Sequence, residues 1–195
     1  MTATDATLRA EPAREDDLPA ILALQRENLA RALAPDEAAS QGFVTIVHTL
    51  ELLQRMHVMA PSVVVRDGAT LAGYALTMPL GCRALIPVLD PMFCLSDALA
   101  WRGRPLSSYR YYVMGQICVA RQHRGRGVFQ ELYRGHAELY APDHDLVVTE
   151  ISARNGRSRR AHEKVGFFEL GRHRDATDDW LFVGWDFAVR PAARR

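Results

Sequence analysis

The apolar positions of this 195-residue chain first follow the period of a strand and then that of a helix. Thr7–Ala10 predicts a short first strand. Helical spacing then begins at Asp16 and Asp17, with Pro19 in the first turn and one face formed by Leu18, Ile21, Leu22, Gln25 and Leu29. A second helical region is predicted at Ala34–Gln41 and Thr45–Met56, interrupted near Gly42.

The middle of the chain changes to strand-like patterns. Ser62–Arg66 and Leu71–Met78 are apolar runs on either side of Asp67-Gly68, which predicts a β-hairpin. Residues 79–109 are irregular and rich in proline, with a short helix predicted at Ser96–Trp101. This segment is either a packed connector that closes one end of the core or a lid over a substrate site.

Strands and helices alternate from residue 111 onward. Strands are predicted at Tyr111–Val119 and Asp145–Ile151, and the second has the consecutive apolar residues of a strand that is covered on both faces. The remaining predictions are helices at Gly127–Tyr140 and Asn155–Lys164, strands at Phe167–Leu170 and Trp180–Phe187, and a basic tail at 188–195.

Composition limits the class of protein. Apolar residues make up 48% of the chain and charged residues 24%, as in an ordinary globular protein, and the length suits one domain over residues 1–187. A net charge of +1 disfavours a nucleic-acid binder. We expect no signal peptide, no membrane-spanning run and no metal site, since the three cysteines are scattered; the expected compartment is the cytoplasm.

The stretch from Gln116 to Phe129 carries the strongest chemical signal. An apolar strand meets the turn Arg124-Gly125-Arg126-Gly127, and a helical pattern starts at once, which is the arrangement of an anion site at a helix N-terminus. Val128 and Phe129 follow the last glycine where a P-loop needs Lys and Ser or Thr, and Gln130 replaces the third glycine of a Rossmann fingerprint. A tight turn with solvated arginines is the alternative to an anion site.

A second motif, NGRSRRAHEKVGF from Asn155 to Phe167, follows about thirty residues later. With these two motifs the chain resembles the GNAT superfamily of N-acetyltransferases, whose first motif reads Arg or Gln, two residues, Gly, one residue, then Gly or Ala. Phe129 departs from the small last residue of that motif. In the second motif, His162 stands where the family usually has tyrosine.

The resemblance implies an α/β (α+β) GNAT fold with a mixed, twisted sheet of six to seven strands, about four flanking helices and splayed parallel central strands. It implies acetyl-CoA as co-substrate and no metal. The pyrophosphate would be held by main-chain amides, the pantetheine arm by the strand edge, and the implied binding residues are Ile117, Cys118, Val119, Arg124, Gly125, Arg126, Gly127, Val128, Phe129, Gln130, Asn155 and Ser158. For Asn155, a helix-capping role is the alternative.

Two residues are candidates for catalysis. His162 would either protonate the leaving thiolate, as the family's tyrosine does, or simply pack against the co-substrate. Some relatives carry a glutamate where this chain has Gln116, so Glu150, at the end of an apolar strand, is the best candidate base. Burial would raise its pKa, and pairing with an arginine or capping the chain exit is the alternative role. Tyr111, Tyr112 and Gln116 are weaker candidates for lining the acceptor site.

The sequence therefore predicts an acetyl-CoA-dependent N-acetyltransferase that acts on a primary amine of a small molecule or a protein. The alternative is a non-catalytic acyl-CoA-binding or regulatory module with the same fold. Asp175, Asp178 and Asp179 would either attract a cationic amine or form a solvated turn. No nucleic-acid or membrane partner is expected, and a homodimer would fit the family.

Overall fold

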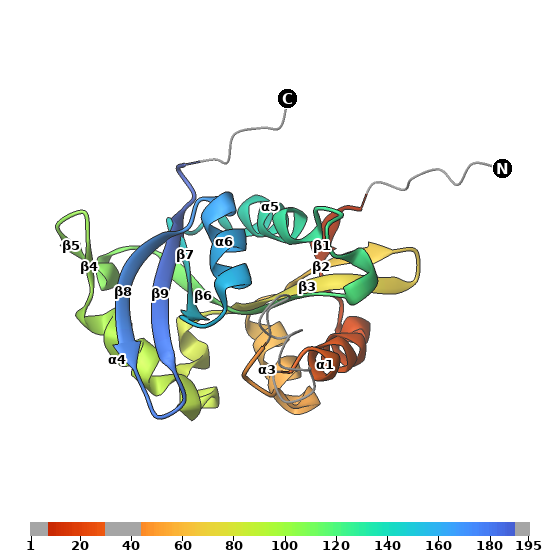
Figure 1. The fold of residues 1–195 in the computed structure, drawn as a ribbon, viewed down its shortest axis with the longest axis horizontal. Helices are drawn as coiled ribbons and strands as arrows, with labels where there is room; N and C mark the ends of the chain where they lie inside the picture. Colours follow the sequence, from red (N-terminus) through yellow and green to blue (C-terminus); the bar gives the residue numbers. More distant parts are fainter. Residues whose placement is uncertain (1–7, 30–43, 190–195) are drawn as a thin grey trace.

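The computed structural model describes residues 8–29 and 44–189. Its centre is a seven-stranded sheet with the order β1-β2-β3-β6-β7-β9-β8, in which only β6 and β7 run parallel (Figure 1). The strands are β1 (Ala10–Pro12), β2 (Val63–Asp67), β3 (Thr70–Met78), β6 (Tyr111–Val119), β7 (Leu146–Ser152), β8 (Phe168–Arg174) and β9 (Asp179–Asp186). This is the mixed sheet that the resemblance implies.

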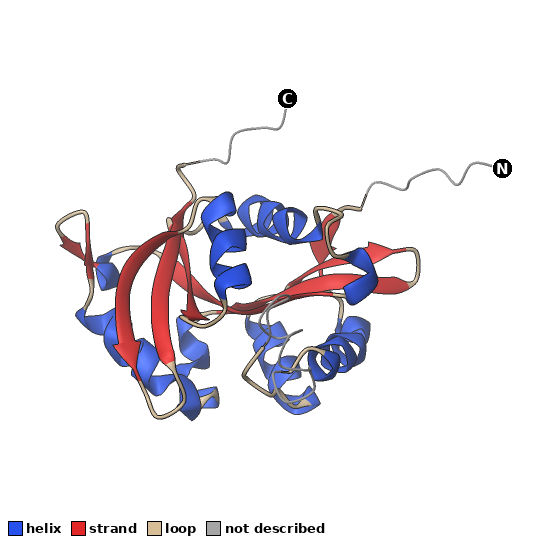
Figure 2. Ribbon diagram, in the orientation of Figure 1, coloured by secondary structure: helices blue, strands red, loops and turns tan. Residues whose placement is uncertain are grey.

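Helices cover both faces of the sheet (Figure 2). One face carries α1 (Leu18–Glu27), α3 (Leu50–Met59) and α4 (Asp90–Ala98), and the other carries α5 (Val128–Tyr140) and α6 (Gly156–Val165). Each face therefore has its own apolar core, the first around Leu18, Tyr74 and Phe182 and the second around Tyr112, Leu132 and Trp185. Burial of these large side chains is the main stabilising term for both layers.

The parallel pair at the centre of the sheet opens along its length. β6 and β7 pair at Tyr111↔Leu146, Tyr112↔Val147 and Val113↔Val148, and pairing stops there although both strands continue. At the opening, the Thr149 hydroxyl donates to the Met114 carbonyl oxygen (2.8 Å). Within the described chain, the β7-facing edge of β6 beyond Met114 consequently has no strand partner.

The segment 79–109 is ordered and packed, but its helix lies earlier than predicted. α4 spans Asp90–Ala98, and the predicted helix at Ser96–Trp101 is wrong beyond Ala98, where a small hairpin of β4 (Ala100–Trp101) and β5 (Arg104–Pro105) begins. Pro91, in the first turn, starts the helix, a position that proline tolerates. Met92 and Phe93 are buried in the core, so tertiary packing decides the position of the helix.

Other elements begin or end at different residues from those predicted. The first strand is Ala10–Pro12, and the helix predicted at Thr45–Met56 begins at Leu50, where the Thr49 side chain caps it by accepting from Leu52 N. The strand predicted at Phe167–Leu170 continues to Arg174. Ala34–Gln41 and the tail from residue 190 lie outside the described residues. No helix in the described ranges is long and apolar enough to cross a membrane.

Candidate active site

The turn between β6 and α5 has the geometry of an anion site. Gly125 and Gly127 have φ of 80° and 82°, in the left-handed region that favours glycine. A Cβ on either glycine would meet nothing within 4 Å, so backbone conformation and not crowding requires glycine here. The first bond of α5 runs from Glu131 N to Gly127 O (3.0 Å). The amides of Val128, Phe129 and Gln130 precede it, and first-turn amides have no acceptor within their own helix.

A cleft of about 650 Å³ opens in front of this turn. It is lined by all ten of the predicted binding residues from Ile117 to Val119 and Arg124 to Gln130, and by Asn155 and Ser158 from the start of α6. The splayed strands thus bring together two motifs that lie thirty residues apart in the sequence. The residues that the resemblance implies line one cleft, and their role in binding stays a prediction.

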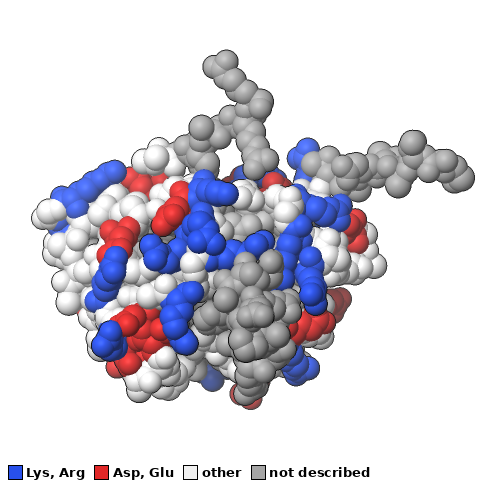
Figure 3. Space-filling view, in the orientation of Figure 1, with Lys and Arg blue, Asp and Glu red and all other residues white. Residues whose placement is uncertain are grey.

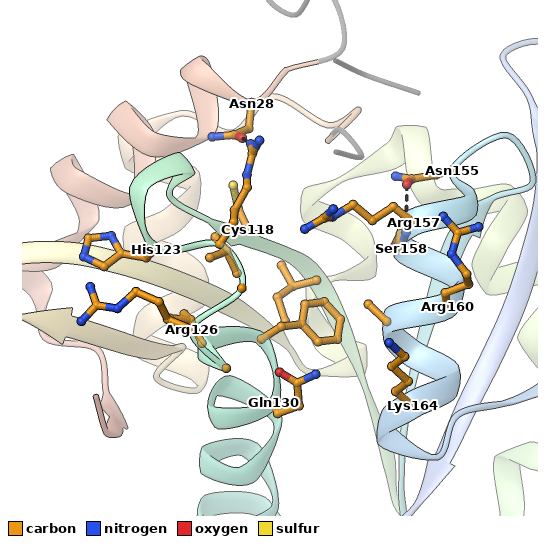
Figure 4. A pocket seen from close by; sticks show the side chains of 18 of the residues that line it. Asn28, Cys118, His123, Arg126, Gln130, Asn155, Arg157, Ser158, Arg160 and Lys164 are labelled. Atoms are coloured by element: carbon orange, nitrogen blue, oxygen red, sulfur yellow. Dashed lines mark hydrogen bonds between the residues drawn. The ribbon is translucent and has the colours of Figure 1, made fainter. Parts of the chain in front are cut away.

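The cleft is basic on both sides. Arg124 and Arg126 lie on the turn. Figure 4 shows Arg126 facing Arg157, Arg160 and Lys164, which follow one side of α6. Figure 3 shows Lys and Arg side chains gathered across this face of the molecule. Such a lining suits a polyanion, because arginine donates to phosphate oxygens in a fixed fork geometry.

The two turn arginines are anchored by neighbouring elements. Arg124 Nη2 donates to Asn28 Oδ1 (2.7 Å), beyond the end of α1. Arg126 Nη1 donates to Asp67 Oδ2 (2.9 Å), on the β2–β3 hairpin, and His123 Nε2 lies 3.2 Å from the same oxygen. Hydrogen bonds from Arg126 and then His123 lower the pKa of the Asp67 carboxyl. The hairpin therefore holds one side of the anion turn in place.

The strand edge and the start of α6 complete this cleft. Burial raises the pKa of the Cys118 thiol to about 12, so the thiol is inert at neutral pH. Asn155 Oδ1 accepts from Ser158 N (3.1 Å), which is the helix cap that the sequence offered as an alternative role. Asn155 also lines the cleft, so capping and ligand contact are compatible.

Phe129, the departure from the family motif, is half-buried and lines the cleft. Its ring lies 5.2 Å from the Tyr133 ring and 5.1 Å from the His162 ring, both edge-on. The side chain belongs to this aromatic cluster, and the residue also forms part of the cleft wall.

The environment of His162 disfavours a proton-donor role. Its Nδ1 lies 2.8 Å from Ser158 O, which can only accept, so Nδ1 carries the proton and Nε2 accepts from the Tyr133 hydroxyl (2.7 Å). Burial lowers the pKa of the imidazole to about 4. The neutral ring therefore has both nitrogens engaged, and these contacts favour the packing role over the donor role.

Glu150 lies in a second cleft on the other side of the strand opening, with a volume of about 380 Å³. Burial raises the pKa of its carboxyl to about 7, although its hydrogen bond with His173 Nε2 acts in the opposite direction. A third, small cavity at the strand opening includes Ile117 and Asn155 of the first cleft and Met114 and Glu150 of the second. The carboxyl therefore lies where the two clefts approach each other.

Gln116 belongs to a buried polar network. Its Oε1 accepts from Gln25 Nε2 and from the Tyr74 hydroxyl, both at 2.7 Å, and its Nε2 donates to Ile46 O (3.0 Å). Gln25 also joins His48 to this network through a 2.8 Å contact between Nε2 and Nδ1. Through these hydrogen bonds, the Gln116 amide links β6 to α1 and to the segment before α3. A side-chain amide cannot act as a general acid or base near neutral pH.

Sequence reasoning missed several residues of the site. Arg157, Arg160 and Lys164 recur on one side of α6 and could have been found from helical spacing. Asp67, Asn28 and His173 carried no local signal, because each reaches the site only through tertiary packing. In the described residues, no group of three His, Cys, Asp or Glu side chains could hold a metal ion.

The sequence matches no protein-family model and no curated protein significantly. Solved structures do match the fold. The ribosomal-protein-S18-alanine N-acetyltransferase of Escherichia coli has a TM-score of 0.63 and 13% identity, with 96% of this chain and 99% of that chain covered. The ribosomal-protein-alanine N-acetyltransferase of Brucella melitensis has a TM-score of 0.59 and 21% identity, with coverage of 91% and 98%.

A third similar structure contains a ligand. The putative acetyltransferase YncA of Salmonella typhimurium, solved with acetyl-CoA, has a TM-score of 0.58 and 16% identity, with 96% of this chain and 99% of that chain covered. At these identities the likeness shows a shared fold over nearly the whole chain.

Proposed function

From the premise that this chain has the GNAT fold, we propose that it is an acetyl-CoA-dependent N-acetyltransferase acting on a primary amine. The observation that carries the proposal is the pairing of a basic cleft at a glycine turn with a second cleft that holds a buried carboxyl. Two clefts that approach each other at the strand opening suit two substrates that must exchange a group.

The residues of the first cleft fit coenzyme A. The first-turn amides of α5 and the arginines on both walls match a pyrophosphate, and the unpaired edge of β6 offers main-chain groups to an extended amide-bearing arm. Acetyl-CoA supplies the reactive thioester. The chain supplies binding, orientation and the removal of a proton from the attacking amine.

Glu150 is the proposed general base, with His173 as its positioning partner. A carboxyl with a pKa of about 7 is half-ionised at neutral pH, which is near the optimum for accepting a proton from an ammonium group. His173 donates to the carboxylate, so it favours the ionised form and fixes the orientation of the carboxyl.

The test is acetyl transfer to a panel of primary amines, with wild-type protein and Glu150→Gln assayed side by side. We expect Glu150→Gln to lower kcat by about a hundredfold or more while calorimetry shows unchanged acetyl-CoA binding. The wild-type kcat should rise with pH through about 7, and His173→Asn should move that rise to higher pH, because the lost hydrogen bond had lowered the pKa. Glu169→Gln, an exposed carboxyl on β8, is the matched control. Equal rates for wild type and Glu150→Gln would rule out the assigned base.

A non-catalytic acyl-CoA-binding module is the second candidate. It is favoured by Gln116 and His162, whose hydrogen bonds leave neither with acid–base chemistry. Binding of acetyl-CoA without transfer to any amine in the panel would select this module.

A further inference from the structure

The second cleft has two chemically different walls. One wall is polar and comes from β7, β8 and the β8–β9 turn, with Glu150, His173 and Asp175. The other wall is apolar and comes from the end of β3, the segment before α3 and residues 88–92. Its members are Val44, Ile46, Val47, Met78, Val88, Leu89, Pro91 and Met92. A ligand that fills this cleft must therefore be polar at one end and apolar at the other.

The apolar wall reaches solvent at two places. Val47 is 51% exposed and Val88 is 63% exposed, and both line the cleft. Exposed aliphatic side chains at the rim of a cavity are typical of a site that receives apolar ligand surface. The cavity volume of about 380 Å³ lies within the range of roughly 300–1,000 Å³ that encloses small molecules.

The charges of the polar wall exclude several acceptor classes. Asp178 is bound by Arg154 Nη2 (2.9 Å) and by the Ser152 hydroxyl (2.6 Å), and Asp175 Oδ1 accepts from Thr177 N (2.7 Å). A carboxylate beside the reacting amine would face the like charge of Asp175 and Glu150, while Arg154, which also lines the cleft, already donates to Asp178, so free amino acids are disfavoured. A second ammonium group, as in a polyamine, would lie against aliphatic side chains without a partner, at a large desolvation cost.

We propose that the acceptor is a small primary amine attached to an uncharged apolar body, held with its nitrogen at Glu150 and its body against Val47, Val88 and Met92. This assignment rests on the proposed function and adds the substrate class to it. Val88, Pro91 and Met92 belong to the segment 79–109. In this proposal the segment is both a packed connector and part of the substrate site, the two roles that the sequence left open.

The first test is binding without turnover. Calorimetry measures 2-phenylethylamine, spermidine, phenylalanine and a short peptide amide with an apolar first residue, each added to protein saturated with coenzyme A. We expect 2-phenylethylamine to bind at least tenfold more tightly than the other three ligands. Equal or tighter binding of spermidine, phenylalanine or the peptide would overturn the assignment.

The second test locates the apolar body. The double variant Val47→Asn/Val88→Asn should raise KM for 2-phenylethylamine on the order of tenfold, because two aliphatic contacts are lost, with kcat and coenzyme A binding unchanged. Val58→Asn is the matched control, since Val58 is 87% exposed on α3 and does not line the cleft. An unchanged KM in the double variant would overturn the proposed position.

The same measurements separate the two proposals. Rapid acetylation of spermidine, with 2-phenylethylamine a poor substrate, would overturn the substrate class and leave the acetyltransferase standing. Tight binding of 2-phenylethylamine without acetyl transfer would support the cleft assignment and overturn the enzymatic function.

Discussion

At the scale of single residues, Glu150 shows how a fold changes the chemistry of a common side chain. The carboxyl is largely buried at the strand opening and its pKa rises to about 7, while Glu169 on the neighbouring sheet edge is exposed and its pKa falls through its hydrogen bond with Arg172. Burial favours the neutral carboxyl over the charged one, so ionisation at Glu150 opposes folding.

Replacement of Glu150 should therefore stabilise the protein at alkaline pH. The folded pKa of about 7 exceeds the ordinary value of 4.5, so the folded state binds the proton more tightly and loses stability as pH rises between those values. We expect the unfolding free energy of Glu150→Gln to exceed that of wild type by up to about 3 kcal/mol at pH 8. Urea unfolding at pH 4 should show little difference. A constant difference at both pH values would contradict the assigned shift.

Replacement of Asp67 should affect the binding of acetyl-CoA and not that of the amine acceptor. Asp67→Ala removes the anchor of Arg126 and His123, so we expect KM for acetyl-CoA to rise several-fold while kcat stays within twofold. Steady-state kinetics with varied acetyl-CoA measure both constants. Asp143→Ala, an exposed charge beyond the end of α5, is the control, and an equal rise of KM there would attribute the effect to net charge.

At the scale of elements, the proposed anion site depends on the conformation of one turn. Gly127 caps α5 in the left-handed region and sets the direction of the first three amides of the helix. The same φ sign occurs at Gly103 in the β4–β5 hairpin, where the glycine has no part in either cleft.

Alanine at Gly127 should consequently weaken coenzyme A binding. Gly127→Ala and Gly103→Ala should each lower the unfolding free energy by about 1–2 kcal/mol, because both place a Cβ at positive φ. Only Gly127→Ala should raise Kd for coenzyme A, by tenfold or more, as measured by calorimetry. Equal affinities in the two variants would show that the turn geometry does not set binding.

At the scale of the whole molecule, buried neutral histidines control stability in acid. Burial lowers the pKa values of His48, His136 and His162 to about 4, below the ordinary value of 6.5. Each ring accepts or donates hydrogen bonds in its neutral form, as His136 does between the Tyr112 hydroxyl and Ala75 O. Between pH 6.5 and 4, these histidines are protonated in the unfolded chain and neutral in the folded protein.

Stability should therefore fall as pH drops from 6.5 toward 4. Each histidine contributes a slope of up to about 1.4 kcal/mol per pH unit, so the three give up to about 4 kcal/mol per unit, from which the opposite titration of Glu150 subtracts up to about 1.4. Urea unfolding at pH 5, 6 and 7 measures this slope. His162→Phe should be less stable at pH 7 and should show a slope smaller by up to about 1.4 kcal/mol per pH unit. An unchanged slope would contradict a neutral His162 in the folded protein.

Elements defined by one continuous stretch of sequence were predicted correctly, whereas an element positioned by contacts with distant residues was not. The hairpin at Asp67-Gly68, the strand Tyr111–Val119 and the helix after Gly127 were predicted because each has its period and its turn residues in one continuous stretch. The helix at Asp90–Ala98 was misplaced because Met92 and Phe93 are buried against distant strands, which no local pattern reveals. The catalytic roles of Glu150 and His162 stay predictions, and so do the domain boundary at residue 187, the cytoplasmic location and the homodimer.

The sequence by itself determined the anion turn and the alternation of strands and helices around it, because glycine conformation and helix-terminus amides are local properties of the backbone. Only the tertiary structure decided that pairing of β6 and β7 ends after Val113, that His173 meets Glu150, and that Tyr133 engages His162. These contacts join residues about 20 to 35 positions apart, and they depend on the twist of the sheet and on which side chains are buried on folding. Hydrogen-bond partners and burial set the chemistry of those groups, and neither is encoded at a single position.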